Sequence, residues 1–319
     1  GSVSARAAVR DIEMMDELSE QQDIRMSLYR PVEADAFALR LRIYRLGLPM
    51  PLSESLPMLE HMGVSVQDEQ SYLLQFGESR AVHLHDFGLR ARVPITDIAP
   101  VKPLFEDTFT KTWRRLVESA GFNCLVLVAG LSSDEVSVLR ALAKYLKQTG
   151  FTFSQTYIEQ TLGENPVIAR KLVELFDARF NPEVCQDRVT GQKEIVASIR
   201  EALDSVANAD EDRILRRFLS VIQAVVRTNF YQHRLIGDSG RQRKPYISFK
   251  IESTKVPELP EPKPLYEIWV YSPRVEGIHL RFGKVARGGL RWSDRMEDFR
   301  TEVLGLVKAQ QVKNAVIVP

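Results

Sequence analysis

Hydrophobic and polar residues alternate along several short runs in the first hundred positions, and this period of two is typical of half-buried strands. The predicted strands cover residues 37–44, 72–76 and 81–93. We expect a bulge at Gly88 in the last of them. A short helix is predicted between the first two strands, from a cap at Ser53 to Gly63. This order of elements predicts a small α+β sandwich with antiparallel strands.

The middle of the chain, about residues 101–235, repeats its hydrophobic residues every three or four positions, as amphipathic helices do. The predicted stripes are Phe105, Phe109, Trp113 and Leu116; then Val138, Leu142, Tyr145 and Leu146; then Ile195, Ile199, Leu203 and Val206; then Ile214, Phe218, Ile222 and Val225. Pro166 and Pro182, each after an asparagine, predict helix breaks or first-turn positions. We therefore expect a helical module here.

From about residue 244 the pattern returns to strands. The predicted strands cover residues 246–251, 266–271 and 277–282. A proline-rich extended connection at 256–264 separates the first two. A helix is expected to start near Asp294, with Glu297 as its capping partner. Its inward-facing residues are predicted to be Phe299, Val303, Leu306 and Val307.

The amino-acid composition excludes several classes of protein for this chain. Lys plus Arg number 43 and Asp plus Glu 42, a balance that argues against a dedicated nucleic-acid binder. No run approaches the ~20 apolar residues of a membrane helix, so no membrane partner is expected. Cys124 and Cys185 are too few for a disulfide framework and are interpreted as reduced thiols of a cytoplasmic protein. Cys124 lies in an apolar run, which favours a buried packing role.

Both ends of the chain indicate a piece of a longer protein. Gly1-Ser2 is typical of the remnant of an expression tag, and residues 1–29 are interpreted as this remnant and a lead-in. The last residues, 316–319, end inside an apolar run, whereas natural C-termini are usually polar.

The strongest candidate for chemistry is the segment Gly283–Trp292, in which Gly288 and Gly289 let a ligand approach the backbone. The cations that flank the two glycines are Lys284, Arg287 and Arg291. Exposed amides and guanidinium groups suit a carboxylate or a phosphate. The alternative is a basic turn between a strand and a helix, and spacing alone does not decide between them. The chain contains neither a Walker loop nor a Gly-x-Gly-x-x-Gly fingerprint.

A resemblance bears on this choice. Residues 284–295 and 298–319 resemble the start of the catalytic region of large bacterial NAD-dependent glutamate dehydrogenases. Residues 123–136 and 153–159 resemble the helical segment of the same family. The first hundred residues are similar, more weakly, to the family's ACT-like modules.

The resemblance implies an α+β chain in three parts. An ACT-like α/β sandwich would cover 30–100, a helical module 101–243, and the truncated start of a substrate-binding domain 244–319. The parent protein would be an oxidoreductase, a homo-oligomer that converts L-glutamate to 2-oxoglutarate and ammonium. The catalytic residues and the region that binds NAD would lie beyond Pro319. This chain alone is therefore expected to bind no NAD and to be inactive.

The resemblance also implies substrate-binding residues. Smaller glutamate dehydrogenases hold a carboxylate with a Lys-Gly-Gly-Ile-Arg motif, and residues 288–291, Gly-Gly-Leu-Arg, match its last four positions. Arg287 stands at the lysine position, so either Arg287 or Lys284 would hold the carboxylate. Lys313 matches a lysine that binds the second carboxylate; without the resemblance it would be interpreted as a last-turn lysine.

Two competing interpretations remain. His83 and His85 share one face of a predicted strand, as two metal ligands would, although solvent-facing histidines are the favoured interpretation and no metal is expected. The rival function is a non-enzymatic protein, with an ACT-like amino-acid sensor or oligomerisation scaffold joined to a helical module. Within the enzyme interpretation, a structural role is favoured over ligand binding for the first hundred residues.

Overall fold

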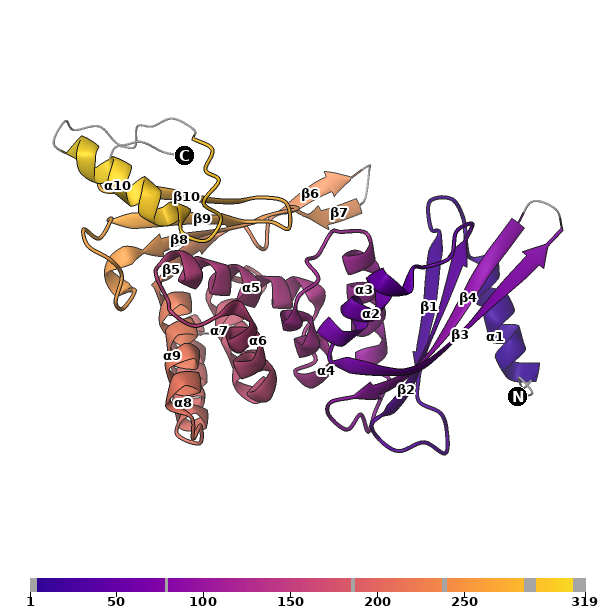
Figure 1. The fold of residues 1–319 in the computed structure, drawn as a ribbon. Coiled ribbons are helices and arrows are strands. Elements are labelled where there is room, and N and C mark those ends of the chain that lie inside the picture. The colour runs from indigo at the N-terminus through magenta and orange to yellow at the C-terminus, as the bar shows by residue number, and fades with distance from the viewer. Residues whose placement is uncertain (1–4, 78–79, 185–186, 237–239, 284–290, 312–319) are drawn as a thin grey trace. The chain divides into compact units, whose positions relative to one another are not determined.

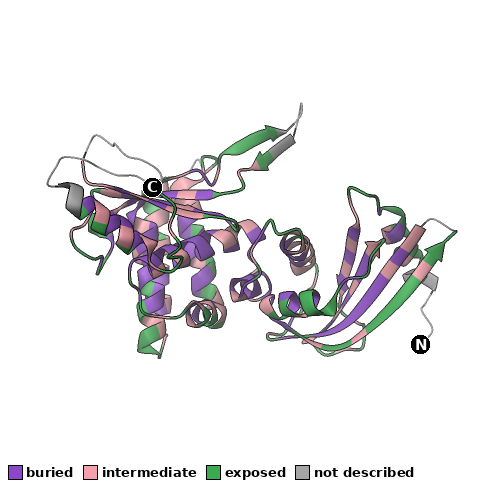
Figure 2. Cartoon of the chain, turned by 45° about the horizontal axis from the view of Figure 1, so that its top comes forward, coloured by how far each residue is buried: buried purple, intermediate pink, exposed green. Residues whose placement is uncertain are grey.

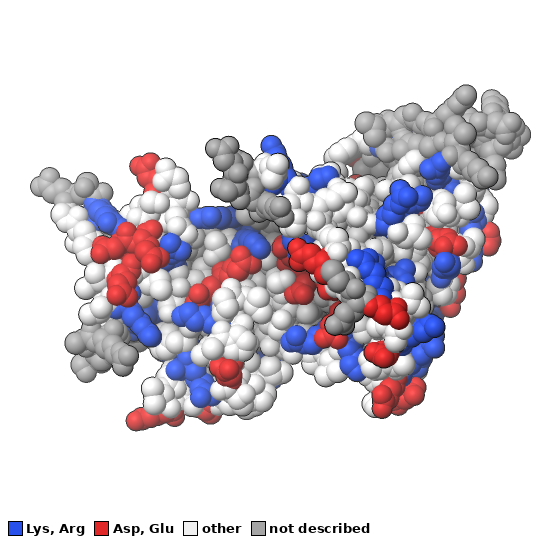
Figure 3. Space-filling model, turned by 180° about the vertical axis from the view of Figure 1, so that it is seen from behind, with Lys and Arg blue, Asp and Glu red and all other residues white. Residues whose placement is uncertain are grey.

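The computed structural model describes residues 5–77, 80–184, 187–236, 240–283 and 291–311 (Figure 1). The chain divides into two units, Gly1–Ser133 and Asp134–Pro319. Among the described helices, none combines the length and apolar character that crossing a membrane requires. Acidic and basic side chains lie next to one another over the face drawn in Figure 3, as their near-equal numbers predict.

The first unit contains one four-stranded antiparallel sheet with strand order β1-β2-β4-β3. Its elements are α1 (Ala5–Asp16), β1 (Ile24–Tyr29), β2 (Ala38–Leu46), α2 (Leu52–His61), β3 (Val64–Phe76), β4 (Arg80–Ala91), α3 (Val101–Trp113), the 3-10 helix η1 (Gly121–Cys124) and α4 (Leu125–Val128). Figure 1 shows α2 and α3 on one side of this sheet and α1 on the other.

Alternation along the strands builds the core of this sheet. Leu41 in β2 is opposite Leu28 on one side and Phe87 on the other, and all three are completely buried. Residues two positions apart point to the same face of a strand, so neighbours such as Leu39 and Ile43 extend the same apolar surface. The strand predicted for 37–44 is therefore confirmed as β2.

Two elements lie within residues 1–29, for which we expect only a lead-in. The helix α1 buries Met15 against the sheet, where it packs with Tyr44 and Val82. The strand β1 alternates buried and half-buried residues along its whole length and pairs with β2. The sheet therefore has one more strand than the predicted strand–helix–strand–strand order.

The bulge predicted at Gly88 lies instead on the neighbouring strand. The register of β3 shifts between Val66 and Asp68, which places the extra residue at Gln67, and Gly88 is opposite Asp68 in the ladder. The prediction is wrong because a glycine in a strand also marks a close approach by another strand's side chain, and an added Cβ at Gly88 would meet the Asp68 carboxylate. The predicted cap is also wrong: α2 begins at Leu52 after Pro51, with no side-chain cap.

The described part of the second unit contains a four-stranded antiparallel sheet ordered β10-β9-β8-β5 and a separate two-stranded hairpin, β6-β7. Its elements are α5 (Ser133–Gln148), α6 (Gln155–Glu164), α7 (Pro166–Phe180), α8 (Arg188–Leu203), α9 (Ala209–Ala224), β5 (Val225–Thr228), β6 (His233–Ile236), β7 (Gly240–Arg243), β8 (Ile247–Glu252), the 3-10 helix η2 (Ser253–Lys255), β9 (Tyr266–Tyr271), β10 (Glu276–Arg281) and α10 (Phe299–Gln311).

One face of the four-stranded sheet is buried under helices. In β9 the buried residues Glu267, Trp269 and Tyr271 alternate with half-buried ones, so they point to one face. Helix α5 reaches this face through the Ala141 carbonyl, which accepts a hydrogen bond from Trp269, and α10 reaches it through Arg300. Both helices therefore lie on the same side of the sheet, where Figure 2 shows buried residues in strands and helices alike.

The structure corrects two predictions in this unit. Helix α10 begins at Phe299, not near Asp294. Residues 296–298 form a turn, and the Ser293 hydroxyl accepts a hydrogen bond from the Arg295 N–H, a local bond that competes with helix formation. The strands β5, β6 and β7 lie in 225–243, where only helices are predicted. The strands predicted over 246–251, 266–271 and 277–282 are confirmed, to within one residue, as β8, β9 and β10.

Candidate functional site

The predicted substrate-binding residues lie mostly outside the described part of the chain. Lys284, Arg287, Gly288 and Gly289 fall in 284–290, and Lys313 falls in 312–319. Only Arg291 is described. The structure therefore shows how the chain is held around this segment, between the end of β10 at Arg281 and the start of α10.

Arg291 is attached to the first turns of α10. Its guanidinium lies 2.8 Å from the Glu302 carboxylate, which also accepts a 2.6 Å hydrogen bond from the Ser293 hydroxyl. The Arg291 side chain remains 58% exposed. A guanidinium carries five N–H donors, so the ion pair with Glu302 orients this side chain and leaves donors available for a ligand carboxylate.

A buried ion pair fixes the start of α10 against the sheet. Arg300 donates from Nε to Glu267 Oε2 at 2.9 Å and from Nη2 to Glu267 Oε1 at 2.6 Å, and both residues are fully buried. Burial alone would lower the pKa of Arg300, but the hydrogen-bonded carboxylate raises it overall. This parallel two-bond geometry fixes orientation as well as distance.

Side chains from α5 complete the network around this pair. The Tyr145 hydroxyl donates to Glu267 at 3.1 Å, and burial with the neighbouring carboxylate raises the pKa of Tyr145. Gln148 accepts a 3.0 Å hydrogen bond from the Arg300 backbone N–H and donates one of 2.9 Å to the Met296 carbonyl. One glutamine thus ties the residues just before α10 to its first turn.

Aromatic packing reinforces this anchor. Trp269 stacks on Phe299, with ring centroids 5.8 Å apart and planes 14° from parallel, and its indole N–H donates to the Ala141 carbonyl at 2.9 Å. The residues that follow the Gly-Gly segment are therefore held to the sheet by a stacked ring, a buried ion pair and a glutamine. The arrangement suits a support for a neighbouring binding segment.

The sequence interpretation missed this support. Glu267 is the one acidic residue of the apolar run 266–271 and stands at an inward-facing position. A charge in such a place needs a partner, because burying it alone is costly. That signal points to an unknown cation, but it does not identify Arg300, 33 residues away in the chain.

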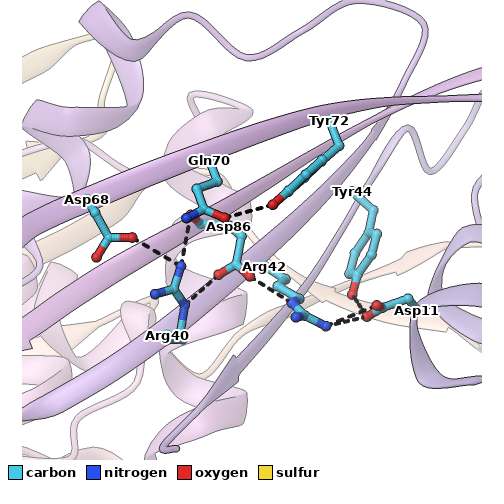
Figure 4. A network of polar contacts seen from close by, with 8 residues as sticks. All are labelled: Asp11, Arg40, Arg42, Tyr44, Asp68, Gln70, Tyr72 and Asp86. Carbon is cyan, nitrogen blue, oxygen red and sulfur yellow. Dashed lines mark hydrogen bonds and ion pairs between the residues drawn. The ribbon is translucent and has the colours of Figure 1, made fainter. Parts of the chain in front are cut away.

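A second charged cluster lies on the α1 side of the first unit's sheet (Figure 4). Asp86 accepts hydrogen bonds from Arg40 at 2.8 Å and from Arg42 at 3.0 Å, and Arg42 also pairs with Asp11 of α1 at 2.9 Å. Asp11 also accepts a hydrogen bond from the Tyr44 hydroxyl. Burial and the neighbouring Asp11 carboxylate raise the pKa of Tyr44. Since each of these charges has a partner of opposite sign, the cluster fastens α1 to the sheet.

The histidine pair considered as a metal site has another role. His85 is 4% exposed; its Nε2 accepts a 3.1 Å hydrogen bond from the Met50 N–H, and its Nδ1 lies 3.0 Å from Glu69. Because Nε2 accepts, Nδ1 carries the proton and donates to Glu69. The prediction that His85 faces solvent is therefore wrong. Within the described residues no three His, Cys, Asp or Glu side chains gather as metal ligands would. Cys124 is buried, as its apolar run predicts.

We expect His85→Ala to lower the free energy of unfolding by about 1–3 kcal/mol, the cost of leaving buried polar groups unpaired. The Met50 N–H and the Glu69 carboxylate would both lose their partner. Urea unfolding followed by circular dichroism measures this change. His83→Ala, on the same strand face but half-buried, is the matched control. A loss for His85→Ala no larger than that for His83→Ala would contradict the structural role.

The described residues do not fit a dinucleotide cofactor. Such cofactors bind at the carboxyl ends of parallel strands, whereas every strand pair in the described part of the chain is antiparallel. We therefore assign no cofactor contact to these residues.

Comparison with known families covers most of the chain. Residues 23–100 match the model described as "Glutamate dehydrogenase, ACT3 domain". Residues 117–182 match "Glutamate dehydrogenase, helical motif 3", and residues 198–319 match "Bacterial NAD-glutamate dehydrogenase, catalytic domain".

Curated relatives agree with these matches. The chain is 44% identical to the NAD-specific glutamate dehydrogenase of Halomonas elongata over 99% of its own length and 19% of that protein. It is 47% identical to the protein of the same name from Pseudomonas aeruginosa, over 98% of the chain and 19% of the relative. For the Mycobacterium tuberculosis protein the identity is 41%, over 100% of the chain and 20% of the relative. The chain thus spans about a fifth of the length of these relatives, and it belongs to the bacterial NAD-glutamate dehydrogenase family.

Proposed function

We propose that this chain is part of an enzyme that oxidatively deaminates L-glutamate to 2-oxoglutarate and ammonium, reversibly and with NAD. The observation that carries the proposal is Arg291, the last residue of a Gly-Gly-Leu-Arg run, held by Glu302 beside the anchored start of α10. A guanidinium fixed in this way suits a carboxylate of the substrate. The relatives are named NAD-specific glutamate dehydrogenases.

In this proposal the chain supplies one wall of the substrate pocket. Glutamate and 2-oxoglutarate each carry two carboxylates, so two cationic positions are needed to orient them. Arg291, with Arg287 or Lys284, would hold one carboxylate beside the amides of Gly288 and Gly289. Lys313 would hold the other. Binding both ends of the substrate fixes the carbon that reacts; the groups that move its proton and hydride belong to the rest of the enzyme.

We assign residues 30–100 a structural role in this protein, residues 101–243 the helical module and residues 244–319 the start of the substrate domain. The paired charges on the ACT-like sheet support a structural role. The enzyme is proposed to be a cytoplasmic homo-oligomer, in keeping with a chain whose two cysteines are too few for a disulfide framework.

The test is NADH oxidation with 2-oxoglutarate and ammonium, by the full-length protein and by the 319-residue chain in parallel. We expect turnover by the full-length protein and none by the shorter chain, which has no dinucleotide fingerprint. A folded full-length protein without turnover on these substrates would refute the proposed reaction. Turnover by the 319-residue chain would refute the proposal that the catalytic and NAD-binding residues belong to the rest of the enzyme.

A further inference from the structure

A groove lies on the helical part of the second unit, along one side of α8. The α8 residues that line it include Val189, Lys193, Val196 and Arg200. They recur at spacings of four, three and four, which places them on one face of the helix. Leu175 of α7 and Gln223 of α9 complete the walls. The groove has a volume of about 490 Å³, within the range of small-molecule sites.

The charged residues of this groove all carry the same sign. Arg179, Lys193 and Arg200 line it, and the lining contains no aspartate or glutamate. In the part of the chain that the structure describes, none of the three forms an ion pair with a carboxylate. Three neighbouring cations raise the local concentration of anions.

Three hydrogen bonds fix the guanidinium of Arg179, which lines the groove. It donates from Nη2 to the carbonyls of Gln223 and Val225, at 3.1 and 2.9 Å, and from Nη1 to Gln192 Oε1 at 3.3 Å. Its Nε is buried and has no hydrogen-bond partner among the described residues. Burial lowers the pKa of Arg179, since no neighbouring carboxylate offsets the desolvation of its charge.

The walls between these cations are apolar. Leu175 is buried, Val196 is half-buried, and Val189 and Ala197 are exposed along the groove. A ligand that satisfied only the cations would leave this apolar surface in water, and one that satisfied only the apolar surface would leave Arg179 uncompensated. The lining therefore matches an amphipathic anion.

We propose that this groove binds a small organic anion whose carboxylate or phosphate head meets Arg179, Lys193 and Arg200 and whose apolar body lies on Leu175, Val189 and Val196. The site uses none of the residues assigned to glutamate binding. The proposal therefore does not depend on the proposed reaction, and its test needs no activity measurement.

The test is calorimetric titration of the 319-residue chain with octanoate and octyl phosphate, which share a body and differ in the head. We expect at least one of them to bind and to bind at least 10-fold more tightly than 1-octanol, acetate or inorganic phosphate. The preferred anion identifies the head group. Circular dichroism confirms that every protein used is folded.

Charge reversal supplies the decisive variants. Lys193→Glu and Arg200→Glu each change an exposed residue and are expected to weaken binding of the preferred anion at least 10-fold. Arg170→Glu makes the same change on an exposed part of α7 outside the lining and is expected to leave the affinity within 2-fold.

Three results would overturn the proposal. They are failure of both anions to bind the unaltered chain, binding of 1-octanol as tight as that of the anions, and equal affinity in Lys193→Glu and Arg170→Glu. Binding of a polyglutamate peptide where neither small anion binds would assign the groove to an acidic chain segment instead.

Discussion

Replacing Arg300 by leucine is expected to lower the free energy of unfolding of the second unit by about 3–5 kcal/mol, the usual cost of breaking a buried ion pair. The substitution leaves the Glu267 carboxylate fully buried without its cation, with hydrogen bonds from the hydroxyls of Tyr145 and Ser253. Hydroxyls donate hydrogen bonds but supply no positive charge, so most of the desolvation cost of this carboxylate goes uncompensated.

Urea unfolding followed by tryptophan fluorescence measures this loss, because Trp269 packs directly on Phe299 at the start of the same helix. The double variant Glu267→Leu/Arg300→Leu removes both charges and is expected to recover a large part of the stability. Arg295→Ala breaks an exposed pair with Asp298 and is expected to leave the transition nearly unchanged. The role assigned to the buried pair fails if Arg300→Leu behaves like Arg295→Ala.

The elements predicted correctly share a physical basis. Strands β2, β8 and β9 each have one buried face, so their hydrophobic residues alternate along the chain, and this pattern is local. Helices α5 and α9 likewise show their buried stripes at helical spacing. In these segments the spacing of the buried residues is enough to tell a strand from a helix.

The missed strands depend on partners far away in the chain. β5 has only four residues, follows α9 directly and pairs with β8, so nothing in Val225–Thr228 alone distinguishes it from the end of the preceding helix. The bulge on β3 is similar: Gly88 is visible in the sequence, but the extra residue belongs to its neighbour, Gln67.

In the candidate site, too, one part could be predicted from the sequence and another could not. A short motif could be found because its glycines and cations are adjacent in sequence, as in Gly288-Gly289-Leu290-Arg291. The buried network that supports this motif could not be predicted, because Tyr145 lies 122 residues before Glu267 and Arg300 lies 33 residues after it. Only the fold brings these three side chains together.

In the full-length enzyme, Lys313→Ala is expected to raise the KM for 2-oxoglutarate about 30-fold or more. Truncating one partner of a buried charge pair costs about 2 kcal/mol or more, and each 1.4 kcal/mol corresponds to a factor of about ten. Arg291→Ala is expected to have an effect of the same order through the other carboxylate. Steady-state assays at saturating ammonium and NADH measure the change, and the KM for NADH should stay unchanged because neither residue is assigned to the cofactor.

Two further variants sharpen this prediction. Lys308→Ala removes an exposed lysine from the last turn of α10 and is the matched control, with an expected change in KM below 2-fold. Arg287→Ala and Lys284→Ala, compared side by side, identify which cation assists Arg291, since only the ligand should show a large rise in the KM for 2-oxoglutarate. If Lys313→Ala changes the KM for 2-oxoglutarate no more than Lys308→Ala does, Lys313 is a helix-end lysine. The second carboxylate is then held elsewhere in the enzyme.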